Sequence, residues 1–129
     1  MLLRSEDTWA DIDYFFAQVS VEDQLVDFKP TCGNILSGVG PAAIEMGLID
    51  AQSGDTGVNI RVVNTGARVA AIVQTPGGMV EYEGDTQIDG VPGAAAPVSL
   101  QFLETVGGAT GRFLPTGNLR DVIDGVEVT

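Results

Sequence analysis

Histidine is absent from this sequence of 129 residues, and cysteine occurs once, as Cys32. A single thiol excludes an internal disulfide and any metal site built from several cysteines, so we expect no metal. Without histidine, neither a serine–histidine nor a cysteine–histidine mechanism can be built from this chain. Any chemistry must therefore use Cys32, carboxylates, the single lysine Lys29, tyrosines or backbone groups.

Basic residues are also scarce, since 6 Lys and Arg stand against 18 Asp and Glu and give a net charge of −12. This excess argues against nucleic acid and anionic membrane surfaces as partners. No apolar run approaches the roughly 20 residues that span a bilayer, and the first residues lack a signal-peptide layout. We therefore expect no membrane partner and a cytoplasmic protein. An anionic ligand is still allowed, because backbone N–H groups at helix starts bind carboxylates locally.

Short apolar segments make up much of the chain, which is 44% hydrophobic and has 17 glycines between those segments. This arrangement is typical of short strands joined by turns. Alternating residues predict strands at 58–64, 67–74 and 96–104, with a turn at 64–66. We also expect strands at 79–82 and from 126 onward, and either one long strand or two within 12–28. The polar stretch 4–11 is expected to be frayed.

One stretch departs from the β pattern. Between 34 and 48 the apolar residues recur at helical spacing, which predicts a helix over about 33–48 with Gly47 as its C-terminal cap. Gly38, Gly40 and Pro41 are poor helix formers. We infer that packing against a sheet holds the helix and that its glycines allow close approach to a strand. The expected fold class is α+β, with strands around one buried helix.

The segment Thr31-Cys32-Gly33-Asn34 stands directly before this predicted helix. A thiol there feels the positive end of the helix dipole, which favours the thiolate. Gly33 lets a substrate approach the backbone N–H groups, and Asn34 can cap the helix or donate to a carboxylate. Proton abstraction next to a carboxylate needs a base and donors that hold the developing enolate, and this segment offers both. The alternative is a buried structural cysteine, the commoner state of a free thiol.

Two further turns have a possible function. Residues 114–118 (LPTGN) have N–H groups and a hydroxyl that could hold a carboxylate, with Asn118 near a possible helix start; otherwise they form a plain turn. Residues 88–93 (IDGVPG) form either a rigid loop that faces a substrate or a crossover between domains. The scattered acidic residues match no calcium-loop spacing and are expected to lie mostly on a solvated surface.

Taken together and in this order, these segments resemble one family, the 2-methylaconitate cis-trans isomerases and 4-oxalomesaconate tautomerases, which have the diaminopimelate epimerase-like fold. The matching segments extend over nearly the whole chain: 11–16 (DIDYFF), 32–34 (CGN), 39–41 (VGP), 47–49 (GLI), 64–65 (NT), 88–93, 114–118 and 125–129 (GVEVT). The resemblance implies a mixed or antiparallel sheet wrapped around one central helix over about 33–48, incomplete relative to the family.

The resemblance also implies a cofactor-free isomerisation of an unsaturated di- or tricarboxylate, in which an allylic proton leaves one carbon and returns to another. It makes Cys32 the catalytic residue and places substrate-binding groups at Gly33, Asn34, Thr116, Gly117 and Asn118. In the family an acid/base lysine lies in a segment that precedes this one. Lys29 does not match its position.

Family members are longer than this chain and have two similar domains with the active site between them. We therefore expect residues 1–95 to form most of the N-terminal domain, and 96–129 the crossover strand and the start of the second. One hypothesis is an isomerase that acts only within a longer protein or an assembly. The other is a catalytically inactive β-rich module that self-associates or binds a partner. An incomplete sheet leaves edges that pair with a second chain, so we expect a homodimer.

Overall fold

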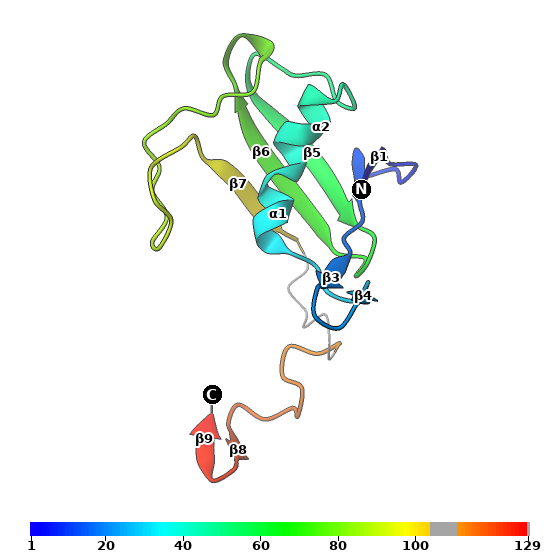
Figure 1. Ribbon diagram of the computed structural model, residues 1–129, viewed down its shortest axis with the longest axis vertical. Helices are drawn as coiled ribbons and strands as arrows, with labels where there is room; N and C mark the ends of the chain where they lie inside the picture. The colour runs from blue at the N-terminus through cyan, green and yellow to red at the C-terminus, as the bar shows by residue number, and fades with distance from the viewer. Residues whose placement is uncertain (104–110, 129) are drawn as a thin grey trace.

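A five-stranded mixed sheet forms the centre of the computed structural model, which describes residues 1–103 and 111–128 (Figure 1). The strand order is β1-β2-β5-β6-β7. The strands are Leu2–Arg4 (β1), Ile12–Tyr14 (β2), Gly54–Val62 (β5), Arg68–Thr75 (β6) and Val98–Phe102 (β7). β2 runs parallel to β5, and the other neighbours are antiparallel. The predicted α+β class with a mixed sheet is confirmed.

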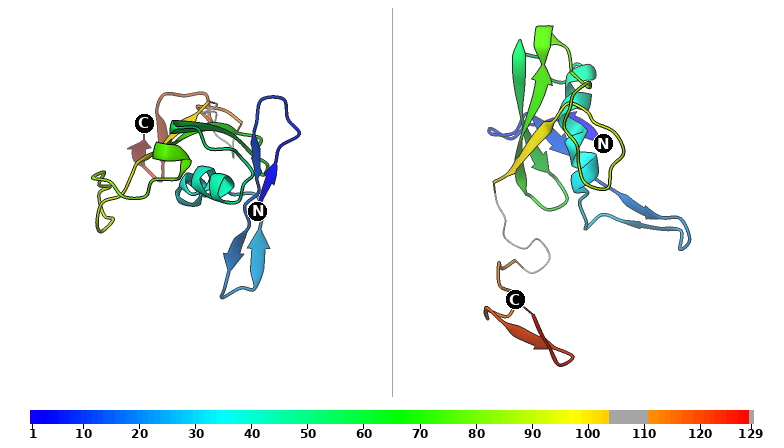
Figure 2. Two further views of the ribbon diagram at one scale, coloured as in Figure 1. Left: turned by 90° about the horizontal axis from the view of Figure 1, so that it is seen from above. Right: turned by 90° about the vertical axis from the view of Figure 1, so that its left-hand side faces the viewer.

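Two short helices, α1 (Gly33–Ser37) and α2 (Val39–Glu45), cover one face of this sheet, as Figure 2 shows from above. The prediction of one continuous helix over 33–48 is wrong in its extent. Pro41 has no N–H to bond the carbonyl of Ser37, so the helical ladder is interrupted near Gly38. The predicted glycine at the C-terminal end of the helix is confirmed: Gly47 directly follows the C-cap residue Met46 and has a φ of 68°, a conformation that glycine adopts at little cost.

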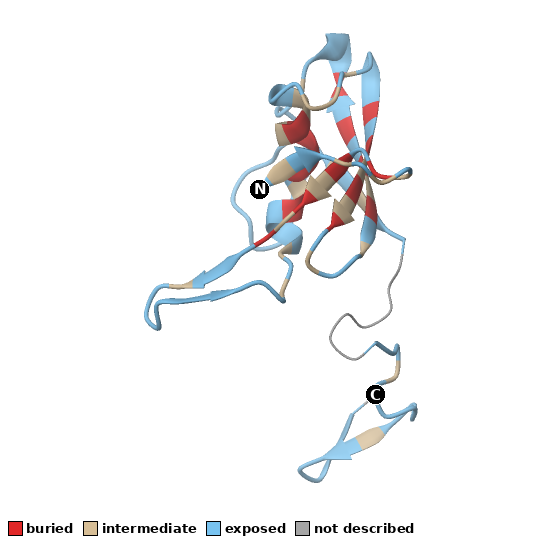
Figure 3. Ribbon diagram, turned by 90° about the vertical axis from the view of Figure 1, so that its right-hand side faces the viewer, coloured by how far each residue is buried: buried red, intermediate tan, exposed pale blue. Residues whose placement is uncertain are grey.

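The core lies between the helices and the sheet. Alternate residues of β5 and β6 are buried while their neighbours face outward, which Figure 3 shows as alternating red and lighter bands. Gly40 of α2 sits against β6, and a Cβ built on it would lie 2.8 Å from Cγ2 of Val73. The predicted close approach of a helix glycine to a strand is therefore confirmed. It allows α2 to settle on the sheet despite its poor helix propensity.

Most of the predicted strands are present with shifted ends. The hairpin of β5 and β6 is confirmed, and Gly66 in its turn has a φ of 75°. The region 12–28 holds β2 and a separate two-stranded arm, β3 (Gln18–Ser20) and β4 (Leu25–Asp27), joined by a turn at 21–24. The predicted strand at 79–82 is wrong. After a 3-10 turn at Pro76–Gly78 (η1) the chain leaves the sheet without regular structure.

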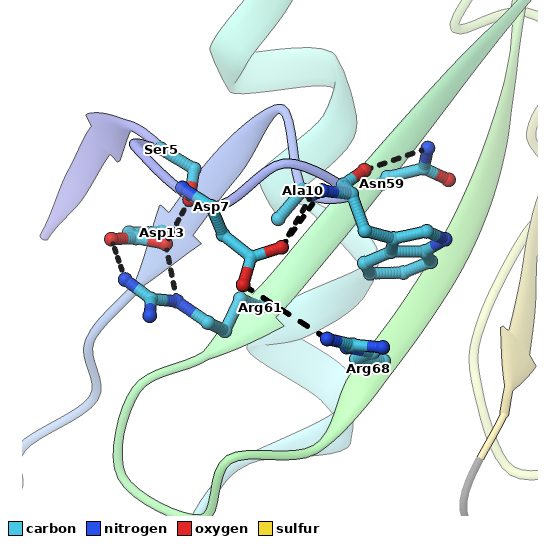
Figure 4. A network of polar contacts seen from close by, with 8 residues as sticks. Ser5, Asp7, Ala10, Asp13, Asn59, Arg61 and Arg68 are labelled. Atoms are coloured by element: carbon cyan, nitrogen blue, oxygen red, sulfur yellow. Dashed lines mark hydrogen bonds and ion pairs between the residues drawn. The ribbon is translucent and has the colours of Figure 1, made fainter.

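The polar stretch after β1 is held in place, so the expectation of a frayed segment is wrong. Figure 4 shows why: the Asp7 carboxylate accepts the backbone N–H of Trp9 at 2.8 Å and of Ala10 at 3.2 Å. Beside it the Asp13 carboxylate accepts two hydrogen bonds from the Arg61 guanidinium, at 2.8 and 2.5 Å. The Ser5 hydroxyl donates to Asp13 at 2.6 Å, and Asp7 pairs with Arg68 of β6 at 3.9 Å, so the loop is held over the outer face of the sheet.

A second hairpin, β8 (Asp121–Ile123) and β9 (Val126–Val128), follows the sheet in the chain and stands apart from it in Figure 1. The connection between β6 and β7, which includes residues 88–93, joins two neighbouring antiparallel strands and is therefore not a crossover. The division into 1–95 and 96–129 stays a prediction. Within the described ranges no helix is long and apolar enough to cross a membrane.

Candidate functional site

Cys32 is the N-cap residue of α1, with extended backbone angles (φ −121°, ψ 110°) and no side-chain hydrogen bond that caps the helix. Its side chain is half-buried and packs against the core. Helical bonding starts with the N–H of Leu36, which donates to the carbonyl of Cys32 at 2.9 Å. The N–H groups of the preceding first turn therefore have no partner within the helix, and they lie next to the thiol.

Gly33 and Asn34 follow the thiol in the first turn and are both exposed. A Cβ built on Gly33 would meet no atom within 4 Å, so the space where a side chain would stand is open to a ligand. Asn34 is not the helix cap, which corrects one of its two predicted roles, because the cap position belongs to Cys32. Its side chain is exposed, and its other predicted role, donation to a carboxylate, stays a prediction.

The position of Cys32 depends on a contact far away in sequence. The side chain of Asn64, in the β5–β6 turn, donates to the carbonyls of Phe16 at 2.8 Å and Phe28 at 2.6 Å. It also accepts the N–H of Phe16 at 2.8 Å. Phe16 follows β2, and Phe28 lies four residues before Cys32. The side-chain amide of Asn64 therefore links the segment that leads into α1 to the end of β2 and to the β5–β6 turn.

Tyr14 belongs to the buried cluster against which Cys32 packs, and no sequence motif marks it as a functional residue. It ends β2, it is 2% exposed, and its hydroxyl is buried without a hydrogen-bond partner. Burial raises the pKa of Tyr14, and the nearby Cys32 raises it further. The alternation of DIDYFF could have revealed this residue, because Ile12, Tyr14 and Phe16 share the buried face.

The predicted carboxylate-binding turn already holds a carboxylate, that of Asp121. The Thr116 hydroxyl donates to Oδ2 of Asp121 at 2.7 Å, and the Asn118 amide donates to Oδ1 at 3.1 Å. These two bonds, Thr116 first, lower the pKa of Asp121. Gly117 closes the turn with a φ of 84°. The expected helix start near Asn118 is wrong, since the chain enters β8 instead.

The structure does not bring the two predicted parts of the site together. Thr116, Gly117 and Asn118 precede the β8–β9 hairpin, which stands apart from the layer of helices that holds Cys32 (Figure 1). Lys29 is exposed and lies just after β4. Among the residues with described positions, no group of three or more His, Cys, Asp or Glu side chains is placed to hold a metal ion.

Comparison with known proteins decides the family. The model of the family described as PrpF protein matches residues 1–129. The chain belongs to the PrpF protein family. The resemblance inferred from the motifs is thereby confirmed.

Several PrpF relatives are close in sequence. "Putative isomerase YbhH" of Escherichia coli strain K12 is 58% identical over 129 residues, which are 100% of this chain and 37% of that protein. "4-oxalomesaconate tautomerase" of Pseudomonas putida is 53% identical over 120 residues, which are 93% of this chain and 33% of that protein. The chain thus spans between 33% and 37% of the length of these two relatives.

A solved structure supports the same assignment. The crystal structure of methylitaconate-delta-isomerase matches with a TM-score of 0.80 and 47% identity, over 93% of this chain and 31% of that one. The expected diaminopimelate epimerase-like domain is thereby confirmed for this member of the PrpF family.

Proposed function

We propose that this chain is part of a cofactor-independent isomerase or tautomerase that moves an allylic proton on an unsaturated di- or tricarboxylate. The substrate would resemble 4-oxalomesaconate or 2-methylaconitate, and activity would require a longer protein or an assembly. One observation carries the proposal. A half-buried thiol lies at the start of α1, beside first-turn amides that have no partner within the helix and beside an open Gly33, in a chain similar over its whole length to a relative named "Putative isomerase YbhH".

In the proposed reaction Cys32 removes or returns a proton next to a carboxylate. When a base removes the allylic proton, the electron pair spreads into the conjugated system and onto carboxylate or keto oxygens. The first-turn N–H groups next to Cys32 stabilise this dienolate. Return of a proton to the far carbon completes the isomerisation. The atom count is unchanged and no oxidant or reductant is needed.

Substrate carboxylates would bind to Gly33 and Asn34 at one end and to Thr116, Gly117 and Asn118 at the other. The Asp121 contacts support the second part, because Thr116 and Asn118 already hold a carboxylate with two neutral donors. A hinge or a further segment would have to bring the two parts together. The second acid/base residue would come from outside this chain.

Protection of the thiol and turnover together test the proposal. Cys32 is the only cysteine, so the rate of alkylation by iodoacetamide reports that sulfur alone. We expect 4-oxalomesaconate to slow alkylation in the wild type and less so in Asn34→Ala, while a monocarboxylate such as crotonate has little effect. Turnover is followed as a change in the conjugated ultraviolet absorbance, and Cys32→Ser should lose about 100-fold or more. Neither protection nor turnover, in the chain alone and in a longer protein that contains it, would refute the proposal.

The second candidate is a non-catalytic module that self-associates as a homodimer. Two features favour it: β1 and β7 are outer strands of the sheet, and the β3–β4 arm exposes Val19, Leu25 and Phe28. Sedimentation measures the mass directly. A dimer that Leu25→Lys dissociates, while Val122→Lys on the other hairpin does not, would support pairing through the arm.

A cytoplasmic location also stays a prediction, tested by fractionation.

A further inference from the structure

The side-chain amide of Asn64 is fully engaged with two other segments of the chain. Asn64 stands in the β5–β6 turn, and its oxygen accepts the N–H of Phe16 at 2.8 Å. Its nitrogen donates to the carbonyl of Phe16 at 2.8 Å and to that of Phe28 at 2.6 Å. Because an asparagine side chain has one acceptor oxygen and two N–H donors, the acceptor and both donors are used. Aspartate has the same shape but no donor when ionised, so it cannot replace this amide.

Two of these three bonds are explained by the needs of Phe16. Phe16 is 8% exposed and follows the end of β2, so its backbone groups need partners within the protein. The third bond has no such explanation. Phe28 is 52% exposed, so water could reach its carbonyl in place of the amide. The bond to Phe28 therefore calls for a role beyond the satisfaction of a buried group.

Phe28 leads directly into the segment that carries the thiol. Pro30 lies between Phe28 and Cys32, and its ring fixes φ at about −65°, which stiffens this short stretch. The ring of Phe28 is stacked on Phe15, with centroids 5.6 Å apart and an interplanar angle of 26°. At the end of the stretch the Cys32 side chain is half-buried and packs against the core. A residue held both at its ring and at its carbonyl thus anchors the chain just before the thiol.

We propose that Asn64 is a positioning residue for Cys32: by holding the carbonyl of Phe28 it fixes the segment 28–31, and so the place of the thiol at the start of α1. Asn64 does not touch the sulfur, and it acts through the backbone alone. The role of this placement in the reaction rests on the proposed function, but the placement itself can be tested on the thiol without any substrate.

Alkylation of Cys32 by iodoacetamide in Asn64→Asp tests this role. Without donors at this position the Phe28 carbonyl is released, the segment opens more often, and the rate at a fixed pH should rise about threefold or more. Thr75→Val is the matched control: it weakens the sheet, but Thr75 pairs with Gly54 at the other end of the β5–β6 hairpin. Its alkylation rate should equal that of the wild type. An unchanged rate in Asn64→Asp, or an equal rise in Thr75→Val, overturns the proposal.

A second variant leaves Asn64 intact and keeps the test valid where Asn64→Asp fails to fold. Pro30→Gly frees the stretch between Phe28 and Cys32, and it should raise the alkylation rate by a similar factor. Because the effect of Asn64 passes through this stretch, adding Asn64→Ala to Pro30→Gly should raise the rate little further. No effect of Pro30→Gly, or full and independent effects of the two substitutions, contradicts the proposal.

A ligand separates this proposal from the proposed function. The tricarboxylate 4-oxalomesaconate should protect Cys32 less in Asn64→Asp than in the wild type, because the thiol no longer keeps its place at the start of α1. A raised alkylation rate in a chain that shows neither protection nor turnover would uphold the positioning and refute the proposed function alone. Equal protection of the wild type and of Asn64→Asp would uphold the proposed function and refute the positioning alone.

Discussion

Replacing Gly40 by alanine tests how closely α2 lies on the sheet. A Cβ at this position would sit 2.8 Å from Cγ2 of Val73, 3.7 Å from Cβ of Ala71 and 3.8 Å from Cγ2 of Val58. Val73 is 1% exposed and its branched side chain has little rotational freedom, so it cannot move aside easily. The helix must therefore lift from the sheet or the strand must shift.

The magnitude follows from two opposing effects. Extra volume in a packed core costs about 1–3 kcal/mol of unfolding free energy. The same substitution restricts the unfolded chain and so contributes about 0.4–1 kcal/mol in favour of folding. Gly38→Ala supplies the matched control, because Gly38 is exposed, has helical angles (φ −81°, ψ −8°) and meets only the Ile35 carbonyl at 3.5 Å. Both variants share the unfolded-state effect, so their difference isolates the clash.

Urea unfolding followed by far-ultraviolet circular dichroism measures the difference. We expect Gly40→Ala to be less stable than Gly38→Ala by about 1–3 kcal/mol. In the Val73→Ala background the penalty at Gly40 should shrink, because the methyl group that it meets is gone. Equal stabilities of the two glycine variants would refute the reasoning, and so would a penalty that Val73→Ala leaves unchanged.

Two further substitutions test polar contacts of the sheet. Thr75→Val removes a hydroxyl that contacts Oγ1 of Thr56 at 2.7 Å and donates to the carbonyl of Gln52 at 2.8 Å; urea unfolding should show a loss of about 1–3 kcal/mol, and an unchanged urea midpoint would contradict the role of these bonds. The hydrogen bonds of Arg61, with a smaller effect of Ser5, hold the pKa of Asp13 below its usual 3.8, so the resulting stability is present above that pH and lost as the pH falls through the folded pKa. Asp13→Asn should therefore lower the urea midpoint at pH 6 and lower it less at pH 3; equal losses at both would contradict the ion pair.

Much of the fold was predictable because its signals are local. The alternation in β5 and β6 and the glycine in their turn fix a hairpin whose register follows from the buried face. The polar loop after β1 was not predictable from its composition. Its order depends on the ion pair of Asp7 with Arg68 and on Ser5 bonding Asp13, which in turn pairs with Arg61, 48 positions away in the chain. The break between α1 and α2 near Gly38 was not predicted either. The spacing of apolar residues is the same in one continuous helix, and it carries no information about the backbone N–H that Pro41 lacks.

The candidate site was predictable in part for a similar reason. The position of Cys32 before a helix is a local property and was found directly. The position of Cys32 beside the central strands depends on the pairing of β2 with β5 and on Asn64, whose amide bonds residues 48 and 36 positions away. Such contacts are visible only once the chain is folded.

Both parts of the proposed site, the start of α1 and the turn at 114–118, offer neutral hydrogen-bond donors to a carboxylate. Thr116 and Asn118 hold Asp121 with a hydroxyl and an amide, and the start of α1 offers backbone amides. Nearby Arg120 is engaged with Glu127 at 3.1 Å. A site that relied on lysine or arginine would lose affinity for an anion as salt rises, because the attraction is screened. Here salt screens the repulsion from a chain of net charge −12. We therefore expect the affinity for a polycarboxylate, measured by protection of Cys32 from alkylation, to stay level or rise between low and moderate salt; a steep fall would place a cation at the site.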